Sequence, residues 1–139
     1  KASLDGLAAL HDGEQTYRGL YANYGVADRV EYPRAEHPVV RTHPETGRKA
    51  LYVSEGQTSR FVGMSQEESN GLLQFLFAHS VKPEFTYRHN WNVSDMLMWD
   101  NRCTMHLALA DYSHEHSRHM HRLTVLGTPC GRRLEANEL

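Results

Sequence analysis

The strongest pattern of apolar and polar positions in this chain is helical and lies between residues 65 and 83. Its apolar side chains recur at three- and four-residue spacing, as expected for one face of a helix: Leu72, Leu73, Leu76 and Phe77. Ser65 followed by Glu68 is typical of a capping box at a helix start, and Pro83 ends the run. A weaker stripe of the same period predicts a second helix over residues 1–11.

Other segments predict about six short strands. Residues 37–43 and 51–55 flank a Pro-Glu-Thr-Gly turn, which indicates a hairpin over 38–54. Four more strands are expected further along the chain: 84–91, 95–100, 103–109 and 118–127. Short strands at this spacing, with a helix inserted between them, predict a mainly β fold of the sandwich or jelly-roll type.

A long polar stretch, residues 12–37, interrupts the predicted elements. It contains four tyrosines with glycine and proline breakers between them. Because long loops inside compact domains are usually functional lids or flexible segments, this stretch is a candidate lid over a site. The 139 residues are enough for one domain, in which residues 128–139 are expected to be a tail.

Composition and charge narrow the choice of partners. The net charge is −2, so no basic field indicates nucleic acid. The longest apolar run is too short to cross a bilayer, and no membrane association is expected. Cys103 and Cys130 form neither a disulfide framework nor a CxxC pair, so a reducing cytoplasm is the expected location. The sequence leaves open whether the protein forms a homo-oligomer.

The ten histidines are the unusual feature, since imidazole serves acid–base chemistry and metal binding. His106 lies in a short apolar segment, where it is either a buried core histidine or a metal ligand. Arg118 and Arg122 share one face of the last predicted strand. They are either surface cations or, inside a barrel, an anion site. Four further histidines offer a zinc alternative, although their spacing fits no closed structural zinc site: His114, His116, His119 and His121.

Four segments of the chain carry a family resemblance. They read HPVVRTHPETGRKALYV, LLQFLFAHSVKPEFTYRHNW, DMLMWDNRCTMH and DY…HRLTVLG. They resemble the taurine dioxygenase family of Fe(II)- and 2-oxoglutarate-dependent dioxygenases, and the likeness extends from about residue 1 to residue 127. The resemblance implies a double-stranded β-helix, or jelly roll, whose Fe(II) is held by two histidines and one carboxylate. It also implies O2 and a small acidic substrate: a sulfonate, a sulfate ester or a carboxylate.

The resemblance assigns roles to five residues. His106 corresponds to the distal histidine ligand of the iron, and Arg118 to the arginine that pairs with the distal carboxylate of 2-oxoglutarate. Arg122 corresponds to the arginine that binds the acid group of the substrate. Trp99 is expected in the pocket wall. Gln57 is expected against the substrate, where the taurine enzyme places an aromatic residue, and this implies a more polar substrate.

One departure from the family pattern concerns the metal. The HxD pair that supplies the other two iron ligands in the family has no counterpart here, which predicts that the pair lies upstream of Lys1. On this interpretation residues 1–139 are the C-terminal portion of one catalytic domain, a jelly roll incomplete at its N-terminus, and are inactive alone. The alternative is a truncated, catalytically inactive jelly-roll module that only binds, because fold alone does not establish activity.

Overall fold

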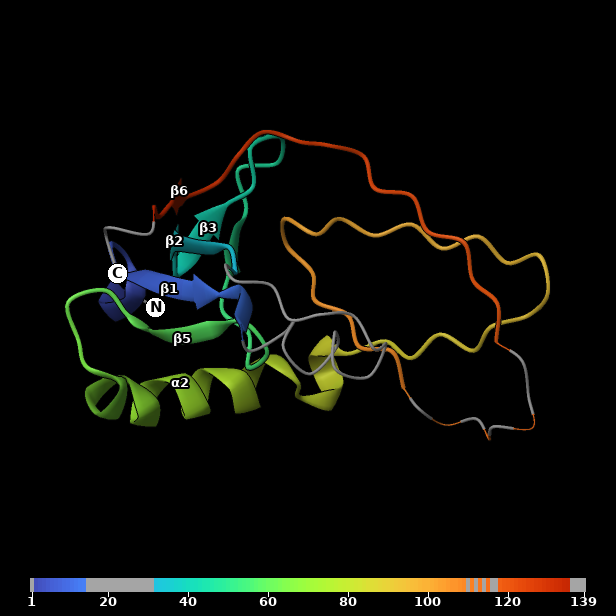
Figure 1. Cartoon of the computed structure of the whole chain (residues 1–139), viewed down its shortest axis with the longest axis horizontal. Helices are drawn as coiled ribbons and strands as arrows, with labels where there is room; N and C mark the ends of the chain where they lie inside the picture. Colours follow the sequence, from blue (N-terminus) through green and yellow to red (C-terminus); the bar gives the residue numbers. More distant parts are fainter. Residues whose placement is uncertain are drawn as a thin grey trace.

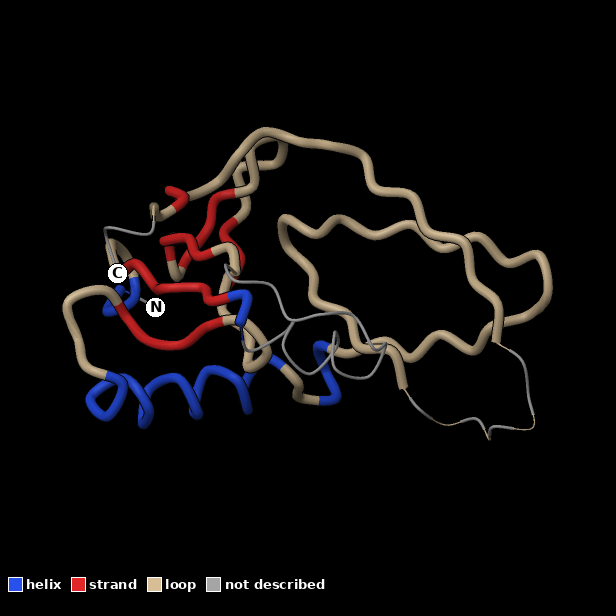
Figure 2. Tube along the Cα trace, viewed as in Figure 1, coloured by secondary structure: helices blue, strands red, loops and turns tan. Residues whose placement is uncertain are grey.

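A computed structural model of the chain describes residues 2–14, 32–109, 111, 113, 115 and 118–135. Their fold is mainly β with one α-helix, which packs below the main sheet in Figure 1 (see also Figure 2). In chain order the elements are η1 (Ala2–Leu4), β1 (Ala8–Asp12), β2 (Arg34–Pro38), β3 (Val40–Thr42), β4 (Lys49–Leu51), β5 (Thr58–Phe61), α2 (Gln66–Ser80), η2 (Pro83–Phe85) and β6 (Arg132–Arg133). No described helix is long and apolar enough to span a bilayer.

The main sheet has the strand order β5-β1-β2-β6, and every neighbouring pair is antiparallel. Ala9 of β1 lies opposite His37 of β2 on one side and Phe61 of β5 on the other. The register of β1 with β5 shifts between Leu10 and His11. Because side chains alternate along a strand, Ala9 and His11 point to the same face of the sheet.

The edge strand β6 returns the C-terminal segment to the sheet. Arg132 pairs with Glu36 of β2 in register, and their side chains form an ion pair at 3.2 Å. Gly131, just before β6, has a φ of +90°, a conformation that glycine adopts without steric cost. A Cβ there would collide with the carbonyl oxygen of Glu36 and with Nδ1 of His37. Glycine is therefore what allows the backbone to approach β2 closely enough to pair.

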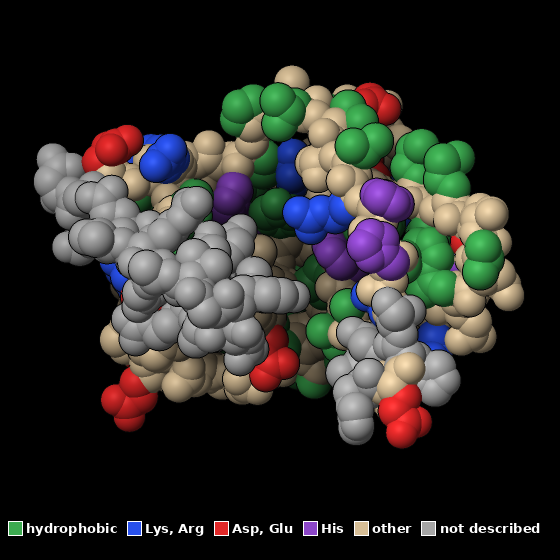
Figure 3. Space-filling view, turned by 45° about the vertical axis from the view of Figure 1, so that its right-hand side comes forward, with side chains coloured by type: hydrophobic (Ala, Val, Ile, Leu, Met, Phe, Trp, Pro, Cys, Tyr) green, Lys and Arg blue, Asp and Glu red, His purple; other side chains and the backbone are tan. Residues whose placement is uncertain are grey.

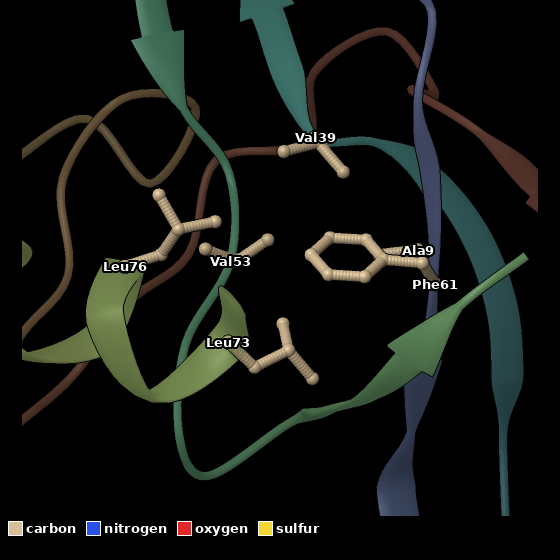
Figure 4. Close-up of a cluster of buried hydrophobic side chains, with 6 residues drawn as sticks. All are labelled: Ala9, Val39, Val53, Phe61, Leu73 and Leu76. Atoms are coloured by element: carbon tan, nitrogen blue, oxygen red, sulfur yellow. The ribbon is translucent and has the colours of Figure 1, made fainter. Parts of the chain in front are cut away.

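The apolar core lies between the sheet and α2, as Figure 4 shows. Its buried members come from β1, β5, α2 and the segments around the hairpin: Ala9, Val39, Val53, Phe61, Leu73 and Leu76. Phe61 is fully buried and Leu73 nearly so. Full burial of a side chain of this size contributes about 1.5–3 kcal/mol. This cluster holds β5 and α2 together.

The helix α2 confirms the helix predicted between residues 65 and 83. Ser65 is its N-cap and accepts a hydrogen bond from the Glu68 N–H at 3.2 Å, while the Ser65 N–H donates to Glu68 Oε2 at 2.7 Å. The Phe61 N–H donates to Ser69 Oγ at 3.0 Å, which ties β5 to the first turn of the helix. The predicted hairpin is also confirmed, since β3 and β4 pair with Arg41 opposite Ala50.

The helix predicted over residues 1–11 is wrong. Only a short 3₁₀ turn, η1, forms there, and β1 follows it as the central strand of the sheet. Gly6, with a φ of +86°, turns the chain between them. Ala9 and Leu10 are both buried, although neighbouring residues of a strand point to opposite faces. Burial on both faces produces a short apolar run that cannot be distinguished by period from part of a helix.

The strands predicted over 84–91, 95–100, 103–109 and 118–127 are also wrong for the described residues. Apart from η2, these segments are irregular and form the long tan loop of Figure 2. Their apolar side chains are exposed, among them Leu107, Leu123 and Val125 at 82%, 97% and 95%. A strand is stable when neighbouring strands take its hydrogen bonds and an apolar layer covers one face. The described residues provide neither for these segments.

Three strands lie where none was expected. β2 lies mostly in the predicted loop 12–37 and reaches the start of the predicted strand 37–43, β6 lies inside the predicted tail 128–139, and β5 lies just after the hairpin. Their sequences, RAEHP, RR and TSRF, are short and rich in polar residues, so they show no alternating pattern. Residues 15–31 of the candidate lid lie outside the described residues, and the lid stays a prediction.

Candidate functional site

The indole of Trp99 and the imidazole of His106 lie against each other. Their ring centroids are 4.8 Å apart and the ring planes meet at 49°. Asn101 Oδ1 accepts a hydrogen bond from the Trp99 Nε1–H at 2.8 Å. The turn between the two rings closes on the carbonyl of Asp100, which accepts the Thr104 N–H at 3.1 Å. His106 is itself exposed, so its imidazole is accessible to a metal ion beside an indole wall.

The other three predicted site residues lie on different segments. Arg118 and Arg122 are exposed in the irregular segment that leads to β6. Because this segment is not a strand, the two arginines do not share a strand face in this structure. Gln57 is exposed in the turn before β5, where its carbonyl accepts the Asp12 N–H at 2.8 Å. The convergence of these three residues on the Trp99–His106 pair stays a prediction.

One face of the molecule gathers histidine side chains. Figure 3 shows several of them beside lysine or arginine side chains around a hollow between two lobes. Of the four histidines in the zinc alternative, His119 and His121 have ring centroids 5.6 Å apart. His114 and His116 lie outside the described residues. The surface therefore offers imidazoles and cations near one another, a combination suited to metals and anions.

Sequence reasoning missed a cluster of charged and polar side chains that joins the β3–β4 hairpin to residues 100–102. His43 follows β3, and its Nε2 lies 3.0 Å from Asp100 Oδ2. Arg102 binds both carboxylate oxygens of Asp100, through Nε at 2.9 Å and Nη2 at 2.7 Å, and reaches Glu45 Oε1 through Nη1 at 2.9 Å. We call these four residues the hairpin clasp.

The hairpin clasp contains a sequence signal that was overlooked. The expectation that the sequence contains neither an HxD nor an HxE motif is wrong, because His43-Pro44-Glu45 is an HxE triplet of the kind that ligates iron. In the structure both of its side chains are already engaged. Nδ1 of His43 accepts the N–H groups of Glu45 and Thr46 at 3.2 and 3.3 Å, Nε2 faces Asp100, and Glu45 binds Arg102. The triplet therefore serves the turn and the clasp.

Asp100 is the centre of the hairpin clasp. The Arg102 guanidinium first, and His43 second, hold the pKa of its carboxyl well below the usual range. His43, Asp100 and Cys103 are the described residues that come close enough together to suggest a metal site. A carboxylate offers about four lone-pair positions. All four positions of Asp100 are in use: three by the backbone N–H, Nε and Nη2 of Arg102, and one by Nε2 of His43. The carboxylate is thus saturated, and the group does not fit a cation.

A second cluster, of histidines, lies beside the apolar core. The rings of His11 and His37 are 4.7 Å apart, and Tyr52 stacks on His11 at 5.6 Å. Thr58 Oγ1 lies 3.2 Å from His11 Nε2. Burial, and then the neighbouring charge of His37, lowers the pKa of His11 from 6.5 to about 4. Burial and the charge of Arg41 lower the pKa of His37 as well. Both imidazoles are therefore held in the neutral form.

This cluster predicts a stability that falls with acidity. The unfolded chain takes up a proton at His11 below about pH 6.5, whereas the folded chain takes it up only near pH 4. The contribution of His11 to the free energy of unfolding is thus fully present above about pH 6.5. It decreases as the pH falls towards 4, by at most about 1.4 kcal/mol per pH unit. Urea unfolding at a series of pH values measures the slope. His11→Gln is expected to flatten it, and the exposed His119→Gln is the control. An unchanged slope in His11→Gln would contradict the assignment.

Comparison with known proteins places the chain among dioxygenases. The profile of the family described as "Taurine catabolism dioxygenase TauD, TfdA family" matches residues 1–124. An α-ketoglutarate-dependent dioxygenase, cnsP of Penicillium expansum, is 40% identical over 125 residues, covering 88% of this chain and 34% of that protein. The α-ketoglutarate-dependent 2,4-dichlorophenoxyacetate dioxygenase of Burkholderia sp. (strain RASC) is 36% identical over 131 residues, covering 94% and 43%. The chain thus spans less than half the length of these relatives.

Solved structures agree with this placement. A 2,4-D dioxygenase-like protein from Burkholderia xenovorans matches with a TM-score of 0.60 and 33% identity, covering 73% of this chain and 40% of that one. AAD-2, solved in complex with Mn(II) and N-oxalylglycine, matches with a TM-score of 0.60 and 32% identity, covering 74% and 36%. The family profile covers the segment with Trp99 and His106, as well as Arg118 and Arg122. This chain belongs to the TauD/TfdA family of dioxygenases.

Proposed function

We propose that this chain is part of an Fe(II)- and 2-oxoglutarate-dependent dioxygenase that hydroxylates a small acidic substrate. The observation that carries the proposal is the family match over residues 1–124, which includes an exposed His106 packed on Trp99 and two arginines four residues apart. The jelly-roll fold of the whole domain belongs to the proposal, since the described residues form only a sheet, a hairpin and a helix.

The residues present fit the metal in part. Non-haem Fe(II) in such enzymes takes two histidines and one carboxylate. His106 suits one of these positions, because its imidazole is exposed beside Trp99 and pairs with no carboxylate among the described residues. His43 does not suit a second position, because both of its ring nitrogens are engaged in the clasp and the turn, and Glu45 binds Arg102 through Oε1. The proposal therefore requires two further ligands, which the family provides as an HxD pair.

The bound iron and its co-substrate would supply the oxidising power of the reaction. The chain's own residues would bind and orient. Arg118 would hold the distal carboxylate of 2-oxoglutarate through a bidentate fork, and Arg122 would neutralise the acid group of the substrate. Trp99 would exclude water from one side of His106, and Gln57 would offer a donor and an acceptor to a polar substrate.

The relatives support an acidic substrate class. Their names include a 2,4-dichlorophenoxyacetate dioxygenase, a sulfonate dioxygenase, an alkylsulfatase and a phenoxypropionate dioxygenase. The names of the three dioxygenases specify organic acids, and the name alkylsulfatase specifies a sulfate ester. A guanidinium at position 122 would recognise the anionic group that these compounds share.

A substrate screen tests the proposal. Succinate formation from 2-oxoglutarate is measured with the full gene product, Fe(II) and panels of sulfonates, sulfate esters and aryloxyalkanoates. We expect succinate release that requires iron and rises with at least one class of acid. Arg122→Gln is expected to weaken the apparent affinity for that acid, seen as a rise in its KM, about 10- to 100-fold, since a hydrogen bond to a charged group contributes about 1.5–3 kcal/mol. The apparent affinity for the co-substrate, 2-oxoglutarate, should not change.

Two other functions predict different results. A jelly-roll module that only binds would show no iron-dependent succinate release under any condition, and the lack of an HxD pair in these residues favours it. A zinc protein using the loop histidines would lose its metal in His116→Ala and keep it in His106→Ala. The dioxygenase predicts the reverse.

A further inference from the structure

We propose that the hairpin clasp positions His106. The inference rests on the proposed function, because it takes His106 as a metal ligand. The clasp residues lie in two segments. His43 and Glu45 lie in the hairpin turn, and Asp100 and Arg102 lie in residues 99–102, which we call the WDNR segment. Their contacts span 57 residues of sequence. They fix the start of the segment that carries Trp99 and His106 to an ordered part of the fold.

The hairpin side of the clasp is held by several hydrogen bonds. The His43 N–H donates to the Arg48 carbonyl at 2.8 Å, and the His43 carbonyl accepts the Gly47 N–H at 2.9 Å. Its side chain is buried with 10% exposed. Because Nδ1 accepts the N–H groups of Glu45 and Thr46, the ring proton lies on Nε2, which donates to Asp100. The imidazole thus points at Asp100 in one orientation and one tautomer.

The WDNR side of the clasp transmits this anchoring to the pair of rings. The Asp100 carbonyl accepts the N–H groups of Cys103 and Thr104 at 3.3 and 3.1 Å, and Thr104 Oγ1 at 2.7 Å. The carboxylate of Asp100 therefore makes the clasp contacts, and the carbonyl of the same residue closes the turn. This turn lies between Trp99 and His106, whose ring centroids are 4.8 Å apart. Loss of the clasp should release the turn and separate the rings.

Two other roles for these side chains fail on geometry. The carboxylate of Asp100 has all its lone pairs in use, so a cation has no place on it. The arrangement of Cys103 with His43 and Asp100 also cannot be a nucleophilic triad. Neither ring nitrogen of His43 is free to take a proton from the thiol, since Nδ1 accepts backbone N–H groups and Nε2–H donates to the carboxylate. What remains is a role in holding the segment.

The test uses Asp100→Asn and His43→Gln in the full gene product. Asp95→Asn is the matched control, because Asp95 also pairs with a histidine, His89 at 3.3 Å, but lies outside the clasp. The first readout is the NMR chemical shift of the His106 ring protons, which the ring current of the neighbouring Trp99 alters. His106→Gln identifies the resonance, and Trp99→Leu gives its chemical shift without the indole ring. Both clasp variants are expected to move the resonance to the chemical shift seen in Trp99→Leu, and the control is expected to leave it unchanged.

The second readout is the affinity for Mn(II), measured by calorimetry without oxygen chemistry. Partners that orient a metal ligand typically change metal affinity about 10- to 100-fold when removed, and we expect a loss of this size in both clasp variants. Arg102→Lys keeps the charge without the fork and is expected to show a smaller loss. Circular dichroism confirms that each variant is folded, and if Asp100→Asn is not, His43→Gln decides the result.

The outcomes separate the two proposals. A displaced resonance together with weakened Mn(II) binding supports the clasp. An unmoved resonance, or full Mn(II) affinity in folded clasp variants, overturns it while leaving the proposed function intact. Absence of Mn(II) binding in the unsubstituted protein overturns the proposed function instead, and the positioning role with it.

Discussion

Replacing His106 by alanine is expected to reduce iron-dependent succinate formation at least about 100-fold. Removing a residue that only orients a ligand already costs about 10- to 100-fold in metal affinity or activity, and removing the ligand itself should cost more. His106 fits this role because its ring is exposed beside Trp99 and engages no carboxylate among the described contacts. The rate of succinate release at saturating iron measures the effect.

The control for His106 is His119→Ala. His119 is also exposed, and its ring contacts that of His121 at 5.6 Å. The proposal gives it no part in the metal site, so its rate should match that of the unsubstituted protein. Equal losses in both variants would indicate a general effect on folding, and full activity in His106→Ala would exclude this residue as a ligand.

Replacing Arg118 by glutamine is expected to weaken the apparent affinity for the co-substrate, 2-oxoglutarate, about 10- to 100-fold, seen as a rise in its KM. A guanidinium that binds a carboxylate through two parallel hydrogen bonds contributes about 1.5–3 kcal/mol, which corresponds to this range. Arg118→Lys keeps the charge but loses the fork, so it should recover only part of the affinity. Steady-state kinetics with 2-oxoglutarate as the varied substrate measures the change.

Arg133→Gln provides the matched control for Arg118. Arg133 is exposed in β6, where it pairs with Ala35 through the backbone, and its side chain is assigned no ligand. It should leave the apparent affinities for substrate and co-substrate unchanged. The assignment of Arg118 would be contradicted if Arg118→Gln weakened the binding of the acidic substrate and left the binding of the co-substrate unchanged, since this would exchange its role with that of Arg122.

The sequence was most informative where local interactions decide the structure. Ser65 and Glu68 cap α2 through contacts three residues apart, and the turn around Gly47 closes the hairpin. Such features depend on neighbours in sequence and can be read from a single chain. The mainly β character was predicted from about six short strands, but of these only the hairpin strands form among the described residues.

Long-range pairing explains most of what was not foreseen. β1 is a central strand because β2 and β5 pair with it, and nothing within AALHD distinguishes it from a helical turn. The segment 118–127 has a good strand pattern but no partner among the described residues, so it stays irregular. Strand formation requires a second segment, and a pattern in one segment cannot supply that information.

The candidate site shows the same division. Sequence resemblance pointed to His106 and Trp99, and the structure brings these two rings together. The resemblance did not point to the hairpin clasp, whose members His43 and Asp100 meet across 57 residues. The HxE triplet at His43 can be read from the sequence. Its contacts cannot: in the structure His43 pairs with Asp100, and Glu45 pairs with Arg102. The roles of Gln57, Arg118 and Arg122 stay predictions.

The central claim is that His106 holds the iron on which 2-oxoglutarate binds. Its most direct test is the visible absorption band that appears when 2-oxoglutarate chelates protein-bound Fe(II) without oxygen. The band is expected in the unsubstituted gene product and in His116→Ala, and it is expected to be absent in His106→Ala. A band of full intensity in His106→Ala would contradict the account.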